Sequence, residues 1–97
     1  MPMRVDVSGP IVEWRGPAPY HFVVVPDDEA DRIAHVAAAV TYGWGMVPVT
    51  CRIGDTVWTT SLWPRANAYV ILIKDQVRRA ERLGLGDWTT VTVQLRV

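Results

Sequence analysis

The clearest structural signal in the chain is residues 46–63, MVPVTCRIGDTVWTTSLW. Apolar and polar side chains alternate from Met46 to Ile53, which is typical of a strand with one buried face. Gly54-Asp55 is a two-residue hairpin signal, and Thr56 to Trp63 is predicted to return as the partner strand, ended by Pro64. The centre of the chain is therefore predicted to be a β-hairpin. The side chains expected to face the core from its first strand are Val47, Val49, Cys51 and Ile53.

Further strands are predicted on both sides of this hairpin. Val5 to Trp14 predicts an edge strand with a break or bulge at Gly9-Pro10, because proline cannot donate to a central ladder. Tyr20 to Val25 is rich in aromatic and β-branched residues and is predicted to be buried on both faces, or nearly so. Tyr69 to Ile73 is wholly apolar and predicts another buried strand. In the last strand the residues expected on the buried face are Val91, Val93, Leu95 and Val97.

Two short helices are predicted between the strands. The acidic residues 27–29 favour a helix N-terminus, since carboxylates stabilise the positive end of the helix dipole. Residues 42–45 are expected to end this helix, whose apolar stripe is Ala30, Ile33, Ala34, Ala37 and Val40. A second helix is predicted from about Asp75, with Gly84 just beyond its C-terminus. Its inward residues are expected to be Val77, Ala80 and Leu83.

The two halves of the chain match when one is shifted along the other. At a shift of 47 positions Pro17 falls on Pro64 and residues 22–25 fall on 69–72; after the first helix the shift becomes 42. We expect one domain over residues 1–97, made of two pseudo-symmetric ββαβ halves at about 5–53 and 56–97. The predicted fold is mostly β with two short helices, a small closed or double-split barrel in which each half covers the other's strand edges. The alternative to a true duplication is that any two ββαβ stretches look alike in their pattern of apolar residues and turns.

Composition limits the classes of partner and compartment. Ten basic and ten acidic residues cancel, so no overall field attracts nucleic acid or a membrane surface. Cys51 is the sole cysteine, which excludes an intrachain disulfide and fits a reducing compartment. The N-terminus lacks the apolar core of a signal peptide, and no stretch approaches the roughly 20 apolar residues of a membrane span. We therefore expect a cytoplasmic protein.

The hairpin sequence also resembles a known family. Residues 53–64, IGDTVWTTSLWP, resemble the IG…W.TSLFP signature of the DUF1905 family, and residues 69–80, YVILIKDQVRRA, resemble its Y.LP.K..VRKA stretch. Trp63 stands where the family usually has Phe, and the usual Pro before Lys74 is missing. The resemblance implies a small barrel of the double-split type. It implies no activity, because the family has none established.

The second half resembles another group as well. Residues 73–79 and 83–87 are similar to the swapped-hairpin antitoxins and transition-state regulators, which form a barrel by dimerisation and bind DNA. Here one chain would supply both halves. On this analogy a DNA-binding domain would bring Arg52, Arg65, Arg78 and Arg79 onto one face.

No recognised catalytic constellation appears in the sequence. His21 and His35 do not stand at metal-ligand spacing with Cys51 or an acid, so structural or solvated roles are expected for both, with no metal and no cofactor. Cys51 is expected to be a small core residue, because a reactive thiolate needs exposure and a positive neighbour. Trp14, Trp58 and Trp88 are expected to pack half-buried in strands rather than stack with bases.

One set of residues is a candidate ligand site: Trp58, Thr60, Arg65, Lys74 and Arg78. Trp58 and Thr60 share a strand face, while Lys74 and Arg78 stand at the start of the second helix. A small anionic or planar ligand could bind between the indole and these cations. The alternative is that Trp58 packs the barrel and the cations are solvated or paired with Asp75 and Glu81.

Three classes of function remain open at this point. A non-catalytic domain that binds a small ligand or another protein is favoured, since no reactive group stands out. A DNA-binding barrel and an enzyme of unrecognised class are the alternatives, because fold analogy alone does not choose among them. A monomer suffices if the chain closes its own barrel, but the first strand could also pair across a homodimer.

Overall fold

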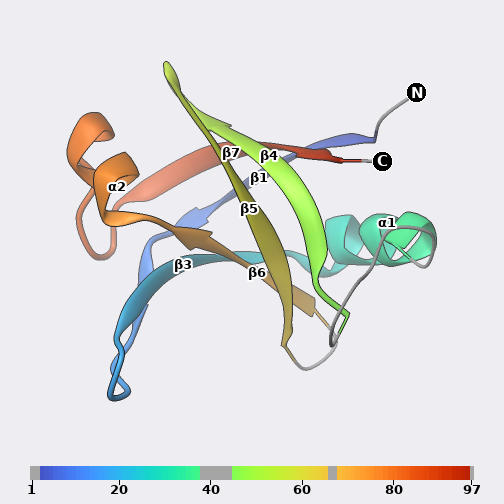
Figure 1. The fold of residues 1–97 in the computed structure, drawn as a ribbon, viewed down its shortest axis with the longest axis horizontal. Coiled ribbons are helices and arrows are strands. Elements are labelled where there is room, and N and C mark those ends of the chain that lie inside the picture. Colours follow the sequence, from blue (N-terminus) through green and yellow to red (C-terminus); the bar gives the residue numbers. More distant parts are fainter. Residues whose placement is uncertain (1–2, 38–44, 66–67, 97) are drawn as a thin grey trace.

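The chain folds into one curved antiparallel sheet with a helix at each end (Figure 1). The structure is a computed structural model that describes residues 3–37, 45–65 and 68–96. The elements are β1 (Arg4–Pro10), β2 (Val12–Trp14), β3 (Tyr20–Val25), α1 (Asp27–Ala37), β4 (Val47–Ile53), β5 (Thr56–Arg65), β6 (Ala68–Ile73), α2 (Asp75–Glu81) and β7 (Trp88–Leu95). Neither helix is long and apolar enough to cross a membrane.

The sheet is an open half-barrel rather than the closed barrel predicted from the sequence. Its strand order is β1-β7-β4-β5-β6-β3-β2, so the predicted first strand supplies both ends of the sheet, on either side of Ile11. The backbone of Ile11 explains the opening, because it bonds to the loop before β7 instead of to a strand. Its N–H donates to Asp87 O (2.9 Å) and its carbonyl accepts from Gly86 N–H (2.8 Å). No ladder joins β1 to β3 within the described residues.

The central hairpin is as predicted, except at its end. β4 and β5 pair from Val47–Leu62 to Ile53–Thr56, and Gly54 takes the turn with φ +56°. The expectation that Pro64 ends β5 is wrong, since Pro64 pairs with Tyr69. β4 begins opposite Leu62, so beyond that point β5 has a neighbour on one side only. A residue without an N–H is tolerated there.

The core fills the concave side of the sheet. The predicted inward residues of β4, and Val91, Val93 and Leu95 of β7, are all buried there. Val97 and Val40 lie outside the described residues, as do residues 42–44 of the predicted helix stop. The inward predictions fail at Ala34 and Ala80, which are exposed. Each is a small side chain at the margin of its stripe, where burial adds little.

The second helix ends earlier than its glycine suggests. Arg82, not Gly84, takes the left-handed conformation at its C-terminus (φ 56°). The turn at Arg82 lets Leu83 N–H donate to Arg78 O (2.8 Å) and packs the half-buried Leu83 against the core. The N–H of Gly84 is satisfied by an Asp87 carboxylate oxygen at 2.7 Å.

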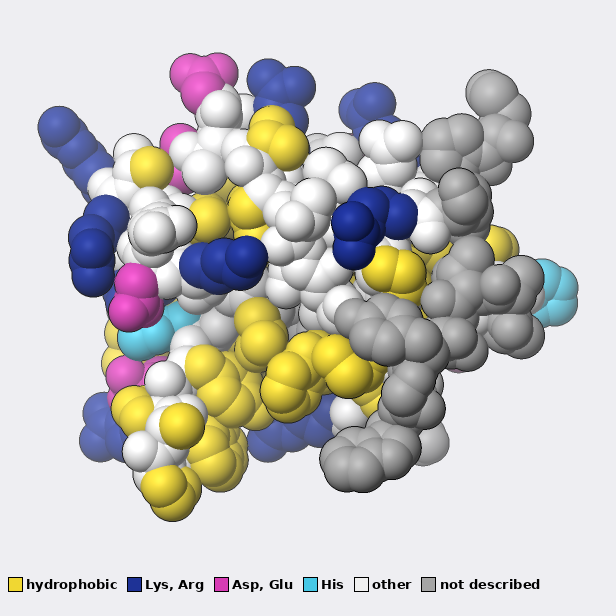
Figure 2. All heavy atoms as spheres, viewed as in Figure 1, with side chains coloured by type: hydrophobic (Ala, Val, Ile, Leu, Met, Phe, Trp, Pro, Cys, Tyr) yellow, Lys and Arg dark blue, Asp and Glu magenta, His cyan; other side chains and the backbone are white. Residues whose placement is uncertain are grey.

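The convex side of the sheet carries two different surfaces. Over β1, β7 and β4 the outward residues are mostly Thr, Ser, Gln and Arg, whereas over β2, β3, β6 and the end of β5 they are apolar and aromatic. Val24 faces solvent, with 45% of its surface exposed, whereas Phe22 on the same face of β3 is only 3% exposed. β3 is therefore buried on its inner face and in part on its outer face. In Figure 2 the apolar side chains form a continuous area in the lower half of the view, over β3 and β6.

Candidate functional site

The predicted ligand residues do not form one cluster. Trp58 is only 8% exposed and lies on the inner face of β5 opposite Cys51, with Thr60 opposite Val49 on the same face. Arg65 lies at the far end of β5, opposite Ala68. Arg65 therefore belongs to a different part of the surface from the residues around α2.

The two cations near α2 each have a partner. Lys74 Nζ donates to the Thr59 carbonyl oxygen at 3.1 Å, and Arg78 donates to an Asp75 carboxylate oxygen at 2.7 Å. The hydrogen bond from Arg78, and then its charge, lower the pKa of the Asp75 carboxyl from its ordinary value. This ion pair is the one that the alternative to a ligand site predicts for Arg78.

Two buried donors in this region are unsatisfied. Trp58 Nε1 and Arg78 Nε have almost no contact with solvent and no hydrogen-bond partner among the described residues. A buried N–H without an acceptor costs roughly 1–3 kcal/mol, so most such groups in proteins find one. An acceptor atom from outside the chain would relieve that cost, which keeps Trp58, Thr60, Lys74 and Arg78 as a candidate ligand site.

A more open site lies on the apolar convex surface. Here a groove of about 440 Å³ crosses β2, β3, β6 and the end of β5. We call it the aromatic groove; its principal residues are Val12, Trp14, Phe22, Val24, Arg65 and Val70. The strand register places them together: Val12 stands opposite Phe22, Val24 opposite Val70, and Arg65 opposite Ala68 at the end of β5.

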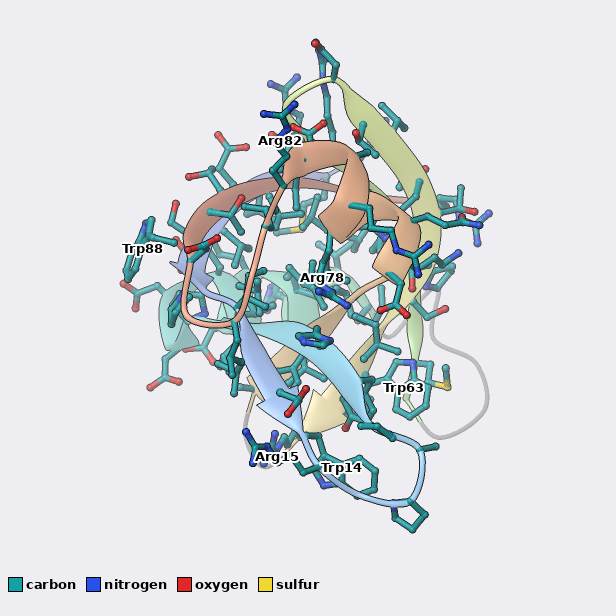
Figure 3. The ribbon with its side chains drawn as sticks, turned by 90° about the vertical axis from the view of Figure 1, so that its left-hand side faces the viewer. Trp14, Arg15, Trp63, Arg78, Arg82 and Trp88 are labelled. Atoms are coloured by element: carbon teal, nitrogen blue, oxygen red, sulfur yellow. The ribbon has the colours of Figure 1, made fainter. Side chains whose placement is uncertain are left out.

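Aromatic rings continue from the groove along the same surface. Trp14 stacks on Tyr20 with ring centroids 5.3 Å apart, and Tyr20 lies 6.4 Å from Trp63. Trp14 and Trp63 are 40% and 42% exposed. Figure 3 shows both on the lower side of the molecule, with Trp88 well apart from them. Four ring systems, including Phe22, thus form one aromatic surface held by rigid strands.

The charged side chains at the groove differ in how they are paired. Glu13 accepts a hydrogen bond from Arg15 Nε at 2.8 Å, so its charge already has a partner. Arg65 makes no ion pair among the described residues, and its guanidinium lies 5.2 Å from the centroid of the Phe22 ring. The groove therefore offers one uncompensated positive charge beside an apolar floor.

Two of the four arginines in the DNA-binding hypothesis, Arg52 and Arg65, lie far apart. Arg52 lies near the turn end of β4, whereas Arg65 ends β5 at the opposite end of the hairpin. Arg78 is half-buried and held by Asp75. The convergence that the DNA-binding alternative requires is therefore not found for Arg52 and Arg65, which most of the length of β5 separates.

The remaining reactive side chains are explained by packing. Burial raises the pKa of the Cys51 thiol to about 12, which leaves it protonated and confirms its prediction as a core residue. Within residues 3–37, 45–65 and 68–96, no three His, Cys, Asp or Glu side chains gather to hold a metal ion. Trp58 is buried more deeply than expected, and Trp88 is 70% exposed rather than half-buried.

The fold and the groove define a small β-sheet domain with an exposed aromatic surface. The family model described as a domain of unknown function, DUF1905, matches residues 8–93. The chain therefore belongs to the DUF1905 family, which confirms the resemblance carried by residues 53–64 and 69–80. No curated protein matches the chain.

Proposed function

We propose that this domain is a non-catalytic binding module whose aromatic groove takes an apolar segment of a partner protein that carries an acidic residue. The observation behind the proposal is the exposed apolar convex surface over β2, β3 and β6, with a groove of about 440 Å³ in it. Soluble domains seldom leave a continuous apolar surface to solvent, and those that do usually use it for binding.

The exposed side chains are of the kinds that contribute most to binding. Trp14, Val24 and Trp63 each leave about two fifths of their surface in water. Covering that surface gains about 25 cal/mol per Å². Trp, Tyr and Arg dominate the energetics of protein interfaces, and all three occur here. The strands already hold these side chains in place, so little conformational entropy is lost on binding.

Charge determines the kind of segment that fits. Because the charge of Glu13 is already paired, the unpaired charge at the groove is the positive charge of Arg65. An acidic side chain on the partner would form a charge-assisted hydrogen bond with that guanidinium. The groove crosses four strands, which suits an elongated segment better than a compact molecule.

The test is selection of displayed random peptides against the whole domain, followed by fluorescence anisotropy with the enriched peptides. We expect apolar sequences with an acidic residue. Val24→Glu should weaken binding at least tenfold, because it places a charge in the groove, and Arg65→Gln should weaken it severalfold. Val57→Glu is the matched control, since Val57 is a 59% exposed strand valine outside the groove.

Two results would overturn this proposal. One is that no peptide is enriched, or that enriched peptides bind Val24→Glu as well as the unaltered domain. The other is a concentration-dependent dimer that Val24→Glu abolishes, which would make the surface an interface between two copies of this chain.

A second candidate function is supported by the unsatisfied donors at Trp58 and Arg78. We propose that Trp58, Thr60, Lys74 and Arg78 bind a small anionic or planar ligand. A thermal-shift screen against anionic metabolites and nucleotides should give a hit that disappears in Trp58→Phe, which removes the indole N–H and keeps an aromatic ring. A hit of the same size in Trp58→Phe and Lys74→Ala would contradict this site.

We also propose that the chain is a duplicated ββαβ unit with a double-split barrel ancestry. In this duplication β1 and β2 together correspond to β5, β3 corresponds to β6, and β4 corresponds to β7. When each strand is replaced by its counterpart, every strand keeps the same neighbours in the sheet, which supports the proposal. A tandem of two copies of residues 56–97 should then fold into a β-rich domain that unfolds cooperatively. Failure of several such tandems to fold would count against duplication.

A cytoplasmic location is proposed on the strength of the cysteine content. The sole thiol, Cys51, is buried and has no partner for a disulfide. A fusion to a fluorescent protein would test it, and an extracytoplasmic signal would refute it.

A further inference from the structure

A second hollow lies on the other convex surface, and its lining is polar. It measures about 350 Å³, which is within the roughly 300–1,000 Å³ of small-molecule sites. We call it the polar hollow; its side chains are Arg4, Thr50, Arg52, Thr90, Thr92 and Gln94. None of them belongs to the aromatic groove.

The strand register explains why these residues meet. Across β1, β7 and β4, Arg4 stands opposite Gln94, and Gln94 stands opposite Thr50. In the adjacent row Thr92 stands opposite Arg52. Arg4 and Arg52 lie on opposite sides of β7, and both side chains line the hollow above it.

Most of the donors in the polar hollow are unused. The side chains of Arg4, Thr50 and Gln94 make no hydrogen bond within the described residues. Arg52 Nε donates to the Gly54 carbonyl at 2.8 Å. That bond orients the guanidinium and leaves its two terminal nitrogens available.

The charge balance in the polar hollow is positive. Arg4 and Arg52 both line it, and one acid, Asp6, hydrogen-bonds to its wall through Thr92 Oγ1 at 2.9 Å. The Asp6 carboxylate stands opposite Thr92 in the register and reduces the field without cancelling it. Guanidinium groups and hydroxyls together match an anion with several oxygens.

We infer that the polar hollow binds a small phosphorylated molecule, with its phosphoryl group between Arg4 and Arg52. A tetrahedral phosphoryl group offers acceptors to both guanidinium groups and to the Thr50 hydroxyl at once. The hollow extends to the exposed side chain of Val57, which gives the rest of the ligand an apolar contact. This site is separate from the aromatic groove, so either could fail without the other.

The test is an amide NMR titration of the whole domain with inorganic phosphate, phenyl phosphate and acetate at constant ionic strength. We expect saturable shifts in β4 and β7 and at Arg52 Nε with both phosphates. Phenyl phosphate should bind severalfold more tightly because its ring contacts Val57. Acetate, which has a single planar carboxylate, should give no saturable shift.

Variants separate this site from general charge effects. Arg4→Gln and Arg52→Gln should each weaken phenyl phosphate binding at least fivefold, and Asp6→Asn should tighten it. Arg79→Gln is the matched control and should leave binding unchanged, because Arg79 is exposed on α2 and lines neither the polar hollow nor the aromatic groove. Equal binding by Arg52→Gln and Arg79→Gln, or shifts that do not saturate, would overturn the inference. So would a salt-dependent response to short DNA without one to phosphate.

Discussion

Cys51 shows how one buried side chain couples this fold to pH. Burial raises the pKa of its thiol from 9.0 to about 12, so the folded domain keeps the proton while the unfolded chain loses it above pH 9. The contribution of the buried neutral thiol to the free energy of unfolding is fully present below pH 9 and is lost as the pH rises toward 12.

The free energy of unfolding should fall by about 1 kcal/mol between pH 7 and pH 10 because of this residue. Urea denaturation across that range will measure the loss. Cys51→Ala removes the titrating group, so the variant should show a pH dependence smaller by that amount. Equal pH dependence in the two proteins would contradict the assignment, as would alkylation of the folded thiol at the rate of a free cysteine.

The central hairpin shows which structural elements the sequence predicts well. Its register depends on local signals, namely strict alternation in β4 and a glycine that can take φ +56°. Helix ends are less predictable, because Arg82 took the left-handed position in place of Gly84. That exchange depends on Leu83 reaching the core, which is a tertiary contact.

Gly54→Ala should destabilise the domain by about 1–2 kcal/mol, the usual cost of a left-handed conformation for a residue with a Cβ. The new methyl would also press on the Glu81 carboxylate, which accepts a hydrogen bond from Thr56. Gly84→Ala is the control, because Gly84 has no positive φ and only an ordinary contact near its Cβ. Chemical denaturation of both variants measures the difference; equal stabilities would show that the turn relaxes.

The aromatic groove illustrates what the sequence leaves open at the scale of the site. β3 is apolar at nearly every position, which predicts burial but does not say which face a helix covers. Val24 stays exposed because α1 and α2 pack on the concave side, although Phe22 on the same face of β3 is buried. The sequence grouped Arg65 with Trp58 and Lys74, but Arg65 lies at the other end of β5 from Trp58.

Closure of the barrel is a property of the whole molecule, and local sequence patterns do not predict it. Each strand was predictable, yet the seam between β1 and β3 depends on where Ile11 places its two backbone bonds. The two strands come close without pairing: a Cβ on Gly9 would lie 3.4 Å from Val23 Cγ1. The seam therefore has room for one methyl group and little more.

Substitutions at Gly9 should measure how tightly the two ends of the sheet meet. Gly9→Ala should change stability little, because the methyl makes ordinary contact with Val23 and the backbone has no positive φ. Gly9→Leu should cost about 1–3 kcal/mol, since a larger side chain must push β1 away from β3. Urea denaturation gives the energies, and amide exchange should speed up in β1 and β3 but not in the β4–β5 hairpin. If Gly9→Leu were as stable as Gly9→Ala, the seam would be wider than the structure indicates, and the sheet would behave as a free-ended half-barrel.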